Sequence, residues 1–281
     1  RCAPEALAFE KQVSQRMEQL RAEFQPLEEE ASLKKARRDI EKKMTVHVQQ
    51  VSGTLDQVAR KCGDIYTLIA GQPNPVWRLY AMYMFASKAV KQWELVSLNN
   101  KAAFPLATVL VKVSTRFPEL LDLTLGLLHS ECCYVSPCAF VARDPATGAE
   151  LAGGQLHRLL GYRELDDPSR PGSKVWESEE TYMQRVEGVM MLYGAIVQVD
   201  EAQNPHGLEH GWHWLARFLN AIPASRPSAK ALIFFLRAAG FAMHRRFRGQ
   251  FIKMLKCMYD EYLPELAHSQ EADIQSVRTL L

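Results

Sequence analysis

Long hydrophobic runs are missing from this chain of 281 residues. The longest, at residues 106–111 and 232–236, are far shorter than the roughly 20 apolar residues that a helix needs to span a bilayer. This absence predicts a soluble domain. The sequence opens at Arg1 rather than at a methionine, so we expect a fragment in which any N-terminal targeting signal would not be visible.

Cysteine and excess charge of one sign are also scarce. Six cysteines in a chain of this length do not form the dense disulfide framework of a small secreted domain, which indicates reduced thiols in the cytosol or nucleus. A formal net charge of +2 is too small to indicate nucleic-acid binding by the whole surface, although local basic faces remain. Composition alone therefore does not indicate a binding partner.

Known catalytic motifs are absent as well. The sequence contains no Gly-x-Ser-x-Gly nucleophile elbow, no P-loop and no Gly-x-Gly-x-x-Gly turn. Gly153 and Gly154 are adjacent, but no predicted strand precedes them, so they do not form a phosphate cradle. We therefore expect a protein that works by binding partners and carries no catalytic centre of its own.

Three histidines, His206, His210 and His213, cluster within residues 204–215. A spacing of four places the first two on one helix face, which suits a metal ion. However, the metalloprotease motif needs a glutamate directly after its first histidine, and Leu208 and Trp212 already explain the segment as a core helix capped by the residues at 204–205. We favour capping and packing, and predict no metal site. The alternative is a metal-dependent hydrolase that uses the three histidines.

Three cysteines, Cys132, Cys133 and Cys138, form a second cluster with the ligand chemistry for zinc. Two adjacent cysteines followed by a gap of four residues lack a matching second pair elsewhere. Buried free thiols are the favoured interpretation.

Helical periodicity runs through most of the chain. Apolar residues recur every three or four positions, and no segment shows a convincing alternation of period two. Ser178 is a good N-cap for one such segment, and Ser228 opens another that reaches about Met243. About nine consecutive helices without a fixed repeat predict an all-α protein, built as an irregular stack of antiparallel helix pairs.

The pattern also suggests a domain organisation. Residues 1–50 are predicted to be an N-terminal helical extension, either a lone amphipathic helix or the end of a coiled coil that lies upstream. Residues 51–281 form the main domain. Within it, residues 135–177 hold four prolines and five glycines around one short helix candidate at 155–160, which predicts a long irregular loop and a candidate surface for partner contact.

Basic residues gather near the C-terminus and on one central helix. The first group is Arg245, Arg246, Arg248, Lys253 and Lys256. Its simplest interpretation is the solvated side of a helix, and the alternative is docking of an acidic partner surface or of RNA phosphates. A direct RNA-binding scaffold is therefore a second functional hypothesis. The other group is Lys88 and Lys91, whose spacing of three places them on one helix face.

Five segments together carry a resemblance to a known family. They read KAVKQ at 88–92, AAFPLA at 102–107, LGYRE at 160–164, LYGAIVQ at 192–198 and NPHGLEHGWHWLARFLN at 204–220. In order and spacing, the chain from about residue 45 onward resembles the C-terminal domain of the Gle-one family of nuclear-pore mRNA-export factors. The segments at 204–220 and 241–247 resemble most the plant and algal branch.

This resemblance implies a fold and a function. The fold is an all-helical, HEAT-like stack related to the middle domain of a translation-initiation scaffold (MIF-four-G-like), preceded by a coiled coil that would mediate self-association. The function is mRNA export: binding a DEAD-box RNA helicase at the cytoplasmic face of the nuclear pore and stimulating its ATPase and RNA-release cycle, with an FG nucleoporin as anchor. Roles in translation initiation and termination, with the corresponding factors as partners, and a location at the nuclear pore, nucleus and cytoplasm are also implied.

Inositol hexakisphosphate is the cofactor that the resemblance implies. A ligand with many phosphates needs several basic residues that converge from different helices, because each exposed ion pair contributes about 1 kcal/mol or less. Lys88 and Lys91 match the family's basic helix, but Ser130 and Glu131 occupy two positions that are often lysine. The negative charge of Glu131 argues against binding. The residues that would compensate are Lys42, Lys43, Lys112 and His129.

Overall fold

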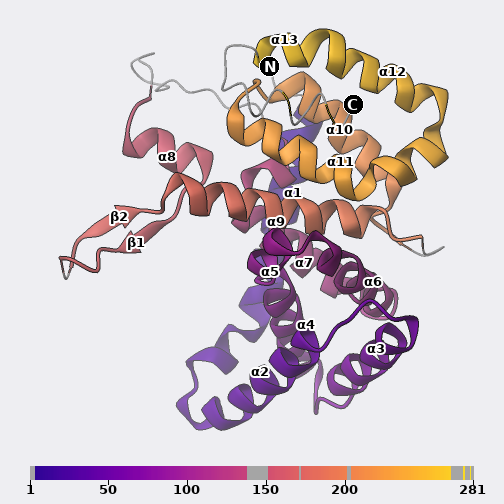
Figure 1. The fold of residues 1–281 in the computed structure, drawn as a ribbon. Helices are drawn as coiled ribbons and strands as arrows, with labels where there is room; N and C mark the ends of the chain where they lie inside the picture. Colours follow the sequence, from indigo (N-terminus) through magenta and orange to yellow (C-terminus); the bar gives the residue numbers. More distant parts are fainter. Residues whose placement is uncertain are drawn as a thin grey trace.

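The computed structural model describes residues 4–137, 151–170, 172–200 and 204–266, together with residues 275 and 279. Most of these residues lie in helices, which confirms the all-α prediction (Figure 1). The helices are α1 (Pro4–Glu29), α2 (Lys34–Gln49), α3 (Leu55–Ala70), α4 (Pro75–Val90), α5 (Trp93–Leu98), α6 (Ala103–Ser114), α7 (Pro118–Glu131), α8 (Gly154–Leu160), α9 (Glu179–Val197), α10 (Leu208–Ala221), α11 (Arg226–Phe247), α12 (Gly249–Cys257) and α13 (Leu263–Leu266). No helix in the described part of the chain is both long and apolar enough to span a bilayer.

Serine side chains begin two of the long helices. The hydroxyl of Ser178 accepts a hydrogen bond from the backbone N–H of Thr181 at 3.2 Å, as the sequence predicts. Helix α11 begins earlier than expected, because Ser225 is its N-cap. Ser228, the predicted start, instead lies in the first turn and completes a capping box with Ser225.

Helix α9 is the central element of the fold. It lies between the C-terminal helices α10–α13 and the helices α2–α7, and it packs most closely against α11, α5 and α6 (Figure 1). The backbone of α9 lies close to the backbones of two neighbouring helices. Gly188 faces the main chain of Trp93 in α5, and Gly194 faces that of Phe235 in α11. The two halves of the molecule therefore share one buried helix, and the hydrophobic core is continuous between them.

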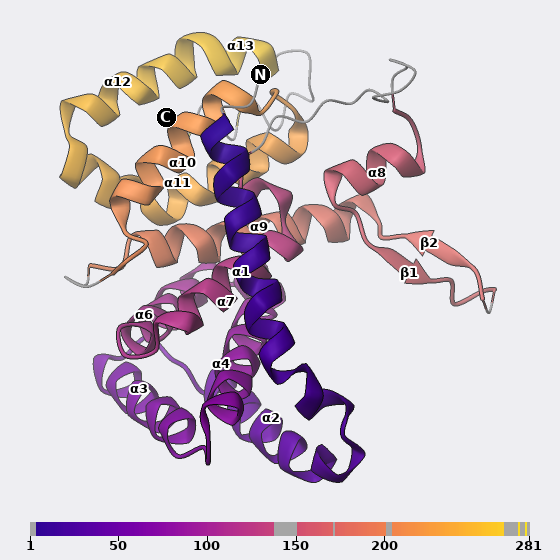
Figure 2. The same ribbon diagram turned by 180° about the vertical axis from the view of Figure 1, so that it is seen from behind.

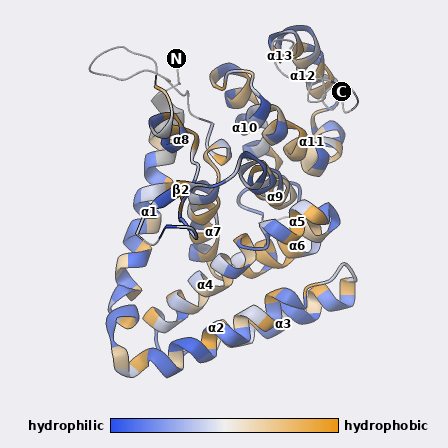
Figure 3. Cartoon of the chain, turned by 60° about the vertical axis from the view of Figure 1, so that its left-hand side comes forward, coloured by the Kyte–Doolittle hydropathy of each residue, from blue (hydrophilic) through white to orange (hydrophobic). Residues whose placement is uncertain are grey.

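Helix α1 crosses the back of the molecule over α7 and α4 (Figure 2). Phe24 is fully buried and its ring lies 4.9 Å from that of Tyr83 and 5.8 Å from that of Tyr80. Near the middle of the helix, Arg16 pairs with Asp122 of α7 at 3.3 Å. Along α1, hydrophilic positions alternate with hydrophobic ones at helical spacing (Figure 3). The predicted helices in residues 1–50 thus pack onto the body, while the division of the chain into two parts and the upstream coiled coil stay predictions.

Residues 151–177 contain a clear departure from the expected secondary structure. Helix α8 matches the predicted short helix, but strands β1 (Glu164–Asp166) and β2 (Lys174–Trp176) form an antiparallel hairpin with Leu165 opposite Val175. The expectation of no strand was wrong, because strands of three residues are too short to show an alternating pattern. The hairpin projects from the body beside α8 (Figures 1 and 2). Residues 138–150 of the predicted loop lie outside the described residues.

Candidate functional site

Lys88 and Lys91 lie at the end of α4, where it packs against α2. The Nζ of Lys88 donates a hydrogen bond to Oε1 of Glu41 at 2.7 Å, and Lys91 is exposed. The pKa of Glu41 is below its usual value because of the hydrogen bond from Lys88, and the charges of Lys88, Lys91 and Arg38 add to this against an opposing effect of burial. Positive charge from two helices therefore converges around one carboxylate.

The other predicted basic residues are distributed unevenly around this group. Lys42 and Lys43 are exposed on α2, and Lys43 forms an ion pair with Asp39 at 2.7 Å. Lys112 is exposed in the last turn of α6, a helix that packs against α3, α7 and α9. Lys42 and Lys43 therefore lie on the same helix as Glu41, whereas Lys112 lies on a different helix.

Glu131 ends α7, and its carboxylate is already neutralised within the chain. It accepts a hydrogen bond from Nη2 of Arg163, which follows α8, and its side chain is only 15% exposed. The Arg163 guanidinium also lies 5.9 Å from the centroid of the Trp93 ring. Ser130 is exposed, and its hydroxyl donates to the carbonyl of Leu127. The sequence suggested an unpaired negative charge at Glu131. In the structure this charge is paired with Arg163.

A buried polar network behind Glu131 holds the hairpin and α8 against α7 and α9. Arg185 of α9 donates to the carboxylate of Glu177, to the backbone oxygen of Glu131 and, at 3.0 Å, to that of Gly161. The same Glu177 carboxylate accepts from the backbone N–H of Arg163 at 2.8 Å. Gly161 ends α8 with φ +79°, a left-handed conformation that favours glycine and directs its carbonyl to this network. One arginine thus fixes three segments that are distant in sequence.

One signal for this network is present in the sequence, at Arg185. This residue lies between Tyr182 and Val186, on the apolar face of the predicted helix. A charged side chain on a buried face requires a partner, since an unpaired buried charge costs several kcal/mol. Nothing in the sequence identifies Glu177 or Arg163 as members of the network, because these pairings depend on the unexpected hairpin.

His129 of α7 faces a cavity of about 330 Å³ between α1 and α7, whose lining includes Arg21 and Glu18 of α1. Burial lowers the pKa of His129 to about 4. At neutral pH its imidazole is therefore uncharged, and it does not supply the compensating positive charge that was expected of it.

The C-terminal basic residues are all exposed, but they lie on two helices. Arg245 and Arg246 are in the last turn of α11, whereas Lys253 and Lys256 are in α12. The helices are separated at Arg248, which has φ +47°, a strained conformation for a residue other than glycine. Arg246 pairs with Glu209 of α10 at 2.7 Å. A groove of about 700 Å³ lies beside them, lined by Arg245, Arg246, Glu209, Asp200 and the exposed ring of Phe241.

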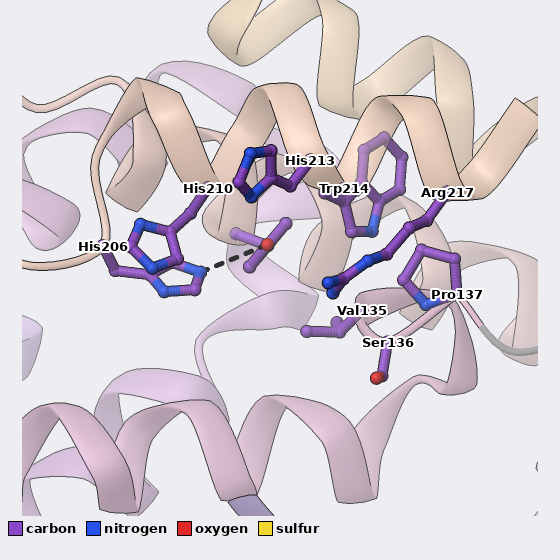
Figure 4. A pocket seen from close by; sticks show the side chains of 9 residues that line it. Val135, Ser136, Pro137, His206, His210, His213, Trp214 and Arg217 are labelled. Carbon is purple, nitrogen blue, oxygen red and sulfur yellow. Dashed lines mark hydrogen bonds between the residues drawn. The ribbon is translucent and has the colours of Figure 1, made fainter. Parts of the chain in front are cut away.

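The three histidines line a small cavity at the start of α10 (Figure 4). The rings of His206 and His210 stack with centroids 4.5 Å apart and planes tilted by 28°, and Nε2 of His206 is hydrogen-bonded to the Tyr193 hydroxyl at 3.2 Å. Stacked rings hold their nitrogens in roughly parallel planes and do not converge on one ion. Within the described residues, no group of three or more His, Cys, Asp or Glu side chains could hold a metal ion. The geometry therefore does not support the hydrolase alternative.

Asn204 does not act as the helix cap that the sequence suggests. Helix α10 begins at Leu208 with Gly207 as its N-cap. The amide of Asn204 instead donates to the backbone oxygens of Ile196 and Val199 at 3.0 and 3.2 Å, while its side-chain oxygen accepts from the N–H of His206. This turn connects α9 to α10 and positions His206.

The two described cysteines of the second cluster are free thiols. Burial raises the pKa of Cys132 to about 11, and burial also raises the pKa of Cys133, whose Sγ donates to the carbonyl of Leu160 at 3.3 Å. Both are therefore protonated at neutral pH. Cys138 lies outside the described residues.

Solved structures share this fold. Two structures of S. cerevisiae Gle1, each bound to a Dbp5 C-terminal domain and IP6, superpose on the chain with TM-scores of 0.83 and 0.82 at 18% sequence identity. Each comparison covers 98% of this chain and 92% of the other. At this identity the likeness establishes the fold.

Sequence comparison identifies the family. The chain is 32% identical over 270 residues to the mRNA export factor GLE1 of Arabidopsis thaliana, and 32% identical over 257 residues to that of Mus musculus. These alignments cover 95% and 84% of this chain but only 38% and 35% of the relatives, so the chain spans well under half of their length. The family model described as GLE1-like protein matches residues 15–259. The chain therefore belongs to the GLE1-like protein family.

Proposed function

We propose that this chain is the helical domain of an mRNA-export factor that binds a DEAD-box RNA helicase and stimulates its ATPase and RNA-release cycle. The observation that carries the proposal is the fold likeness over 98% of the chain to Gle1 bound to a Dbp5 C-terminal domain. The names of the curated relatives as mRNA export factors support the same role. The ATP chemistry belongs to the helicase, and the chain contributes a surface with no catalytic activity of its own.

The packing around α9 suits such a role. Because α9 is buried between α5 and α6 on one side and α11 on the other, the two halves of the molecule form one connected core. A rigid scaffold loses little conformational entropy when it binds, so more of its interaction energy is available to hold the two helicase lobes in an open arrangement.

Inositol hexakisphosphate is the second ligand of the proposal. Its binding surface would be Arg38, Lys88 and Lys91, with Lys42 beside them on α2. Each charge-assisted contact to a phosphate is worth more than a neutral hydrogen bond, and a ligand with six phosphates contacts several of them at once. In the structure, Lys88 donates its hydrogen bond to the carboxylate of Glu41, so a phosphate would compete with this carboxylate for Lys88. Arg163, which the sequence did not indicate, is a basic residue close to this surface, because its guanidinium lies 5.9 Å from the centroid of the Trp93 ring, two residues after Lys91. Its charge is paired with that of Glu131.

An ATPase assay tests the central claim. The purified chain is added to a DEAD-box export helicase with saturating RNA, with and without hexakisphosphate, and ATP turnover is measured. We expect the chain to raise turnover several-fold. No increase at saturating chain in either condition would refute the activator role.

Titration calorimetry with hexakisphosphate tests the binding surface separately. The double variant Lys88→Glu, Lys91→Glu should lose measurable affinity, whereas Lys253→Glu, the same charge reversal on α12, should keep it. Glu41→Gln removes the competing carboxylate and should tighten binding about threefold to fivefold, the equivalent of one partly exposed ion pair. Equal affinities for Glu41→Gln and the unmodified chain would argue against a site at Lys88.

The remaining partners and the location are part of the same proposal. An FG nucleoporin, translation initiation and termination factors, self-association through an upstream coiled coil, and residence at the nuclear pore, nucleus and cytoplasm follow from family membership and stay predictions. Direct RNA binding through Arg245, Arg246 and their neighbours also stays a prediction. It requires a steeply salt-dependent RNA affinity that charge reversal at these two arginines removes.

A further inference from the structure

Helix α2 carries a row of positive charge on its outer side. The helix lies at the end of the molecule opposite α10–α13 and packs against α4 and α3 (Figures 1 and 2). Arg37 has a structural role, because it is half-buried and donates to the backbone oxygens of Leu27 and Glu30. Four further basic residues are exposed and form what we call the basic row: Lys34, Lys35, Arg38 and Lys42.

The basic row is not neutralised by the rest of the described structure. The two acidic residues of α2 are engaged with other partners, because Asp39 pairs with Lys43 at 2.7 Å and Glu41 pairs with Lys88 at 2.7 Å. No member of the row takes part in an ion pair or a side-chain hydrogen bond with another described residue. Four positive charges therefore lie side by side on a chain whose formal net charge is only +2.

The shape of the row excludes a compact ligand. From Lys34 to Lys42 it extends about 12 Å along the helix axis, and side chains on the outside of one helix point away from one another. A ligand such as hexakisphosphate needs basic groups that converge from several helices. It would therefore reach the end of the row near Lys88 and Lys91 and leave Lys34 and Lys35 free. An extended anion fits the row better.

The outer side of α2 also lacks the apolar surface that a protein partner or a membrane needs. Hydrophilic residues predominate along the helix (Figure 3). The structure describes the whole of α2, and its one exposed large apolar residue is Val46, which is 40% exposed. A stable protein interface has an apolar centre, and an amphipathic helix binds a membrane through an apolar face. Binding to the phosphates of a nucleic acid requires neither.

We propose that the basic row binds single-stranded RNA through its phosphates, without reading the bases. Lys34, Arg38 and Lys42 follow one another about 6 Å apart along the helix axis, and a flexible single strand can adapt its phosphates to this spacing. Helix α2 contains no Phe, Tyr or Trp on which a base could stack, so binding is independent of base sequence. The acidic residues 28–30 precede the row, so the strand extends from Lys34 toward Lys91.

This activity goes beyond the proposed stimulation of a helicase and does not depend on it. The row shares Arg38 and Lys42 with the proposed hexakisphosphate surface, whereas Lys34 and Lys35 belong to the row alone. Variants at Lys34 and Lys35 therefore test RNA binding separately. Loss of RNA binding with unchanged hexakisphosphate affinity and unchanged helicase stimulation is the expected result for them.

The test uses the purified chain and a fluorescently labelled oligouridine of about ten nucleotides, long enough to cover the row. Fluorescence anisotropy gives the binding constant at several sodium chloride concentrations. Four phosphate contacts predict that the logarithm of the binding constant falls with the logarithm of the salt concentration with a slope of about −3. The double variant Lys34→Glu, Lys35→Glu should bind at least tenfold more weakly at low salt, with a slope of about half that size.

A matched charge reversal elsewhere completes the experiment. Arg245→Glu, Arg246→Glu changes the net charge of the chain by the same amount and should keep the RNA affinity, whereas the alternative RNA surface on α11 predicts its loss. The milder variant Lys34→Gln, Lys35→Gln removes the charges without reversing them and should also weaken binding. Unchanged affinity in both row variants, a slope near zero, or tighter binding to polyglutamate or to phosphatidylserine vesicles than to oligouridine would overturn the proposal.

Discussion

Arg185 and Glu177 form an ion pair in which both side chains are almost fully buried, with exposed fractions of 1% and 2%. Such a pair gains little net stability over apolar residues of the same size, because both charges lose their hydration. Its value here is positional. The pair connects α9 to the end of β2, and the same guanidinium bonds the backbone at Glu131 and Gly161. The hairpin therefore has one defined orientation relative to α7.

Removing one member of this pair should be costly. Arg185→Met leaves Glu177 buried without its charged partner, and we expect the free energy of unfolding to fall by about 3 to 5 kcal/mol. Chemical denaturation measures this loss. The control is Lys174→Met, which breaks the exposed pair with Asp166 in the same hairpin and should cost about 1 kcal/mol or less. Similar losses for the two variants would contradict the buried network.

Glu131 offers a second test, because the sequence and the structure lead to opposite expectations for its substitution by lysine. From the sequence alone, Glu131→Lys adds a basic residue where the family often has one. In the structure, the new ammonium would face Arg163, so like charges would meet in a partly buried place. We expect Glu131→Lys to lower the free energy of unfolding by about 3 kcal/mol or more. Glu131→Gln, which keeps an acceptor for Arg163, should cost about 1 to 2 kcal/mol. Equal losses would show that Arg163 does not depend on the carboxylate.

These residues also mark how far prediction from the sequence reaches. The long helices follow from the spacing of apolar residues alone, as at Tyr182 and Val186 in α9. The pairing of Arg163 with Glu131 spans 32 positions and depends on a hairpin whose strands are three residues long. Local periodicity carries no information about such a contact. The convergence of Lys88 and Lys91 on Glu41 is likewise a tertiary property, since α2 and α4 are separated by the whole of α3.

His206 predicts a pH dependence of stability. Burial lowers its pKa to about 3, with smaller contributions from His210 and His129, whereas an unfolded chain keeps a value near 6.5. The unfolded state therefore binds this proton more readily than the folded state. Stability is fully present above about pH 6.5 and is lost as the pH falls toward 3, by up to about 1.4 kcal/mol per pH unit.

Urea unfolding between pH 7 and pH 4.5 checks this dependence. His206→Gln cannot take up the proton, and its amide can still bond the hydroxyl of Tyr193. The difference in unfolding free energy between the unmodified chain and the variant should therefore shrink as the pH falls. His129 contributes to both proteins and cancels in this difference. A difference that stays constant over the whole range would mean that His206 is protonated as easily in the folded state as in the unfolded one.

Gly188 and Gly63 provide a last, matched comparison of two helical glycines. A Cβ at Gly188 would lie 2.1 Å from the carbonyl oxygen of Trp93 and 2.8 Å from its carbonyl carbon, and these backbone atoms cannot move without shifting α5. Gly188→Ala should therefore cost about 3 kcal/mol. At Gly63 of α3 no atom lies within 4 Å of the new Cβ, so Gly63→Ala should raise stability by about 0.5 to 1 kcal/mol. Thermal unfolding distinguishes the two.

Because Trp93 follows Lys91 by two residues and faces Arg163, Gly188→Ala should also weaken hexakisphosphate binding, whereas Gly63→Ala should leave it unchanged. A Gly188→Ala protein with unaltered stability would show that α5 and α9 do not approach as closely as their shared backbone contact requires.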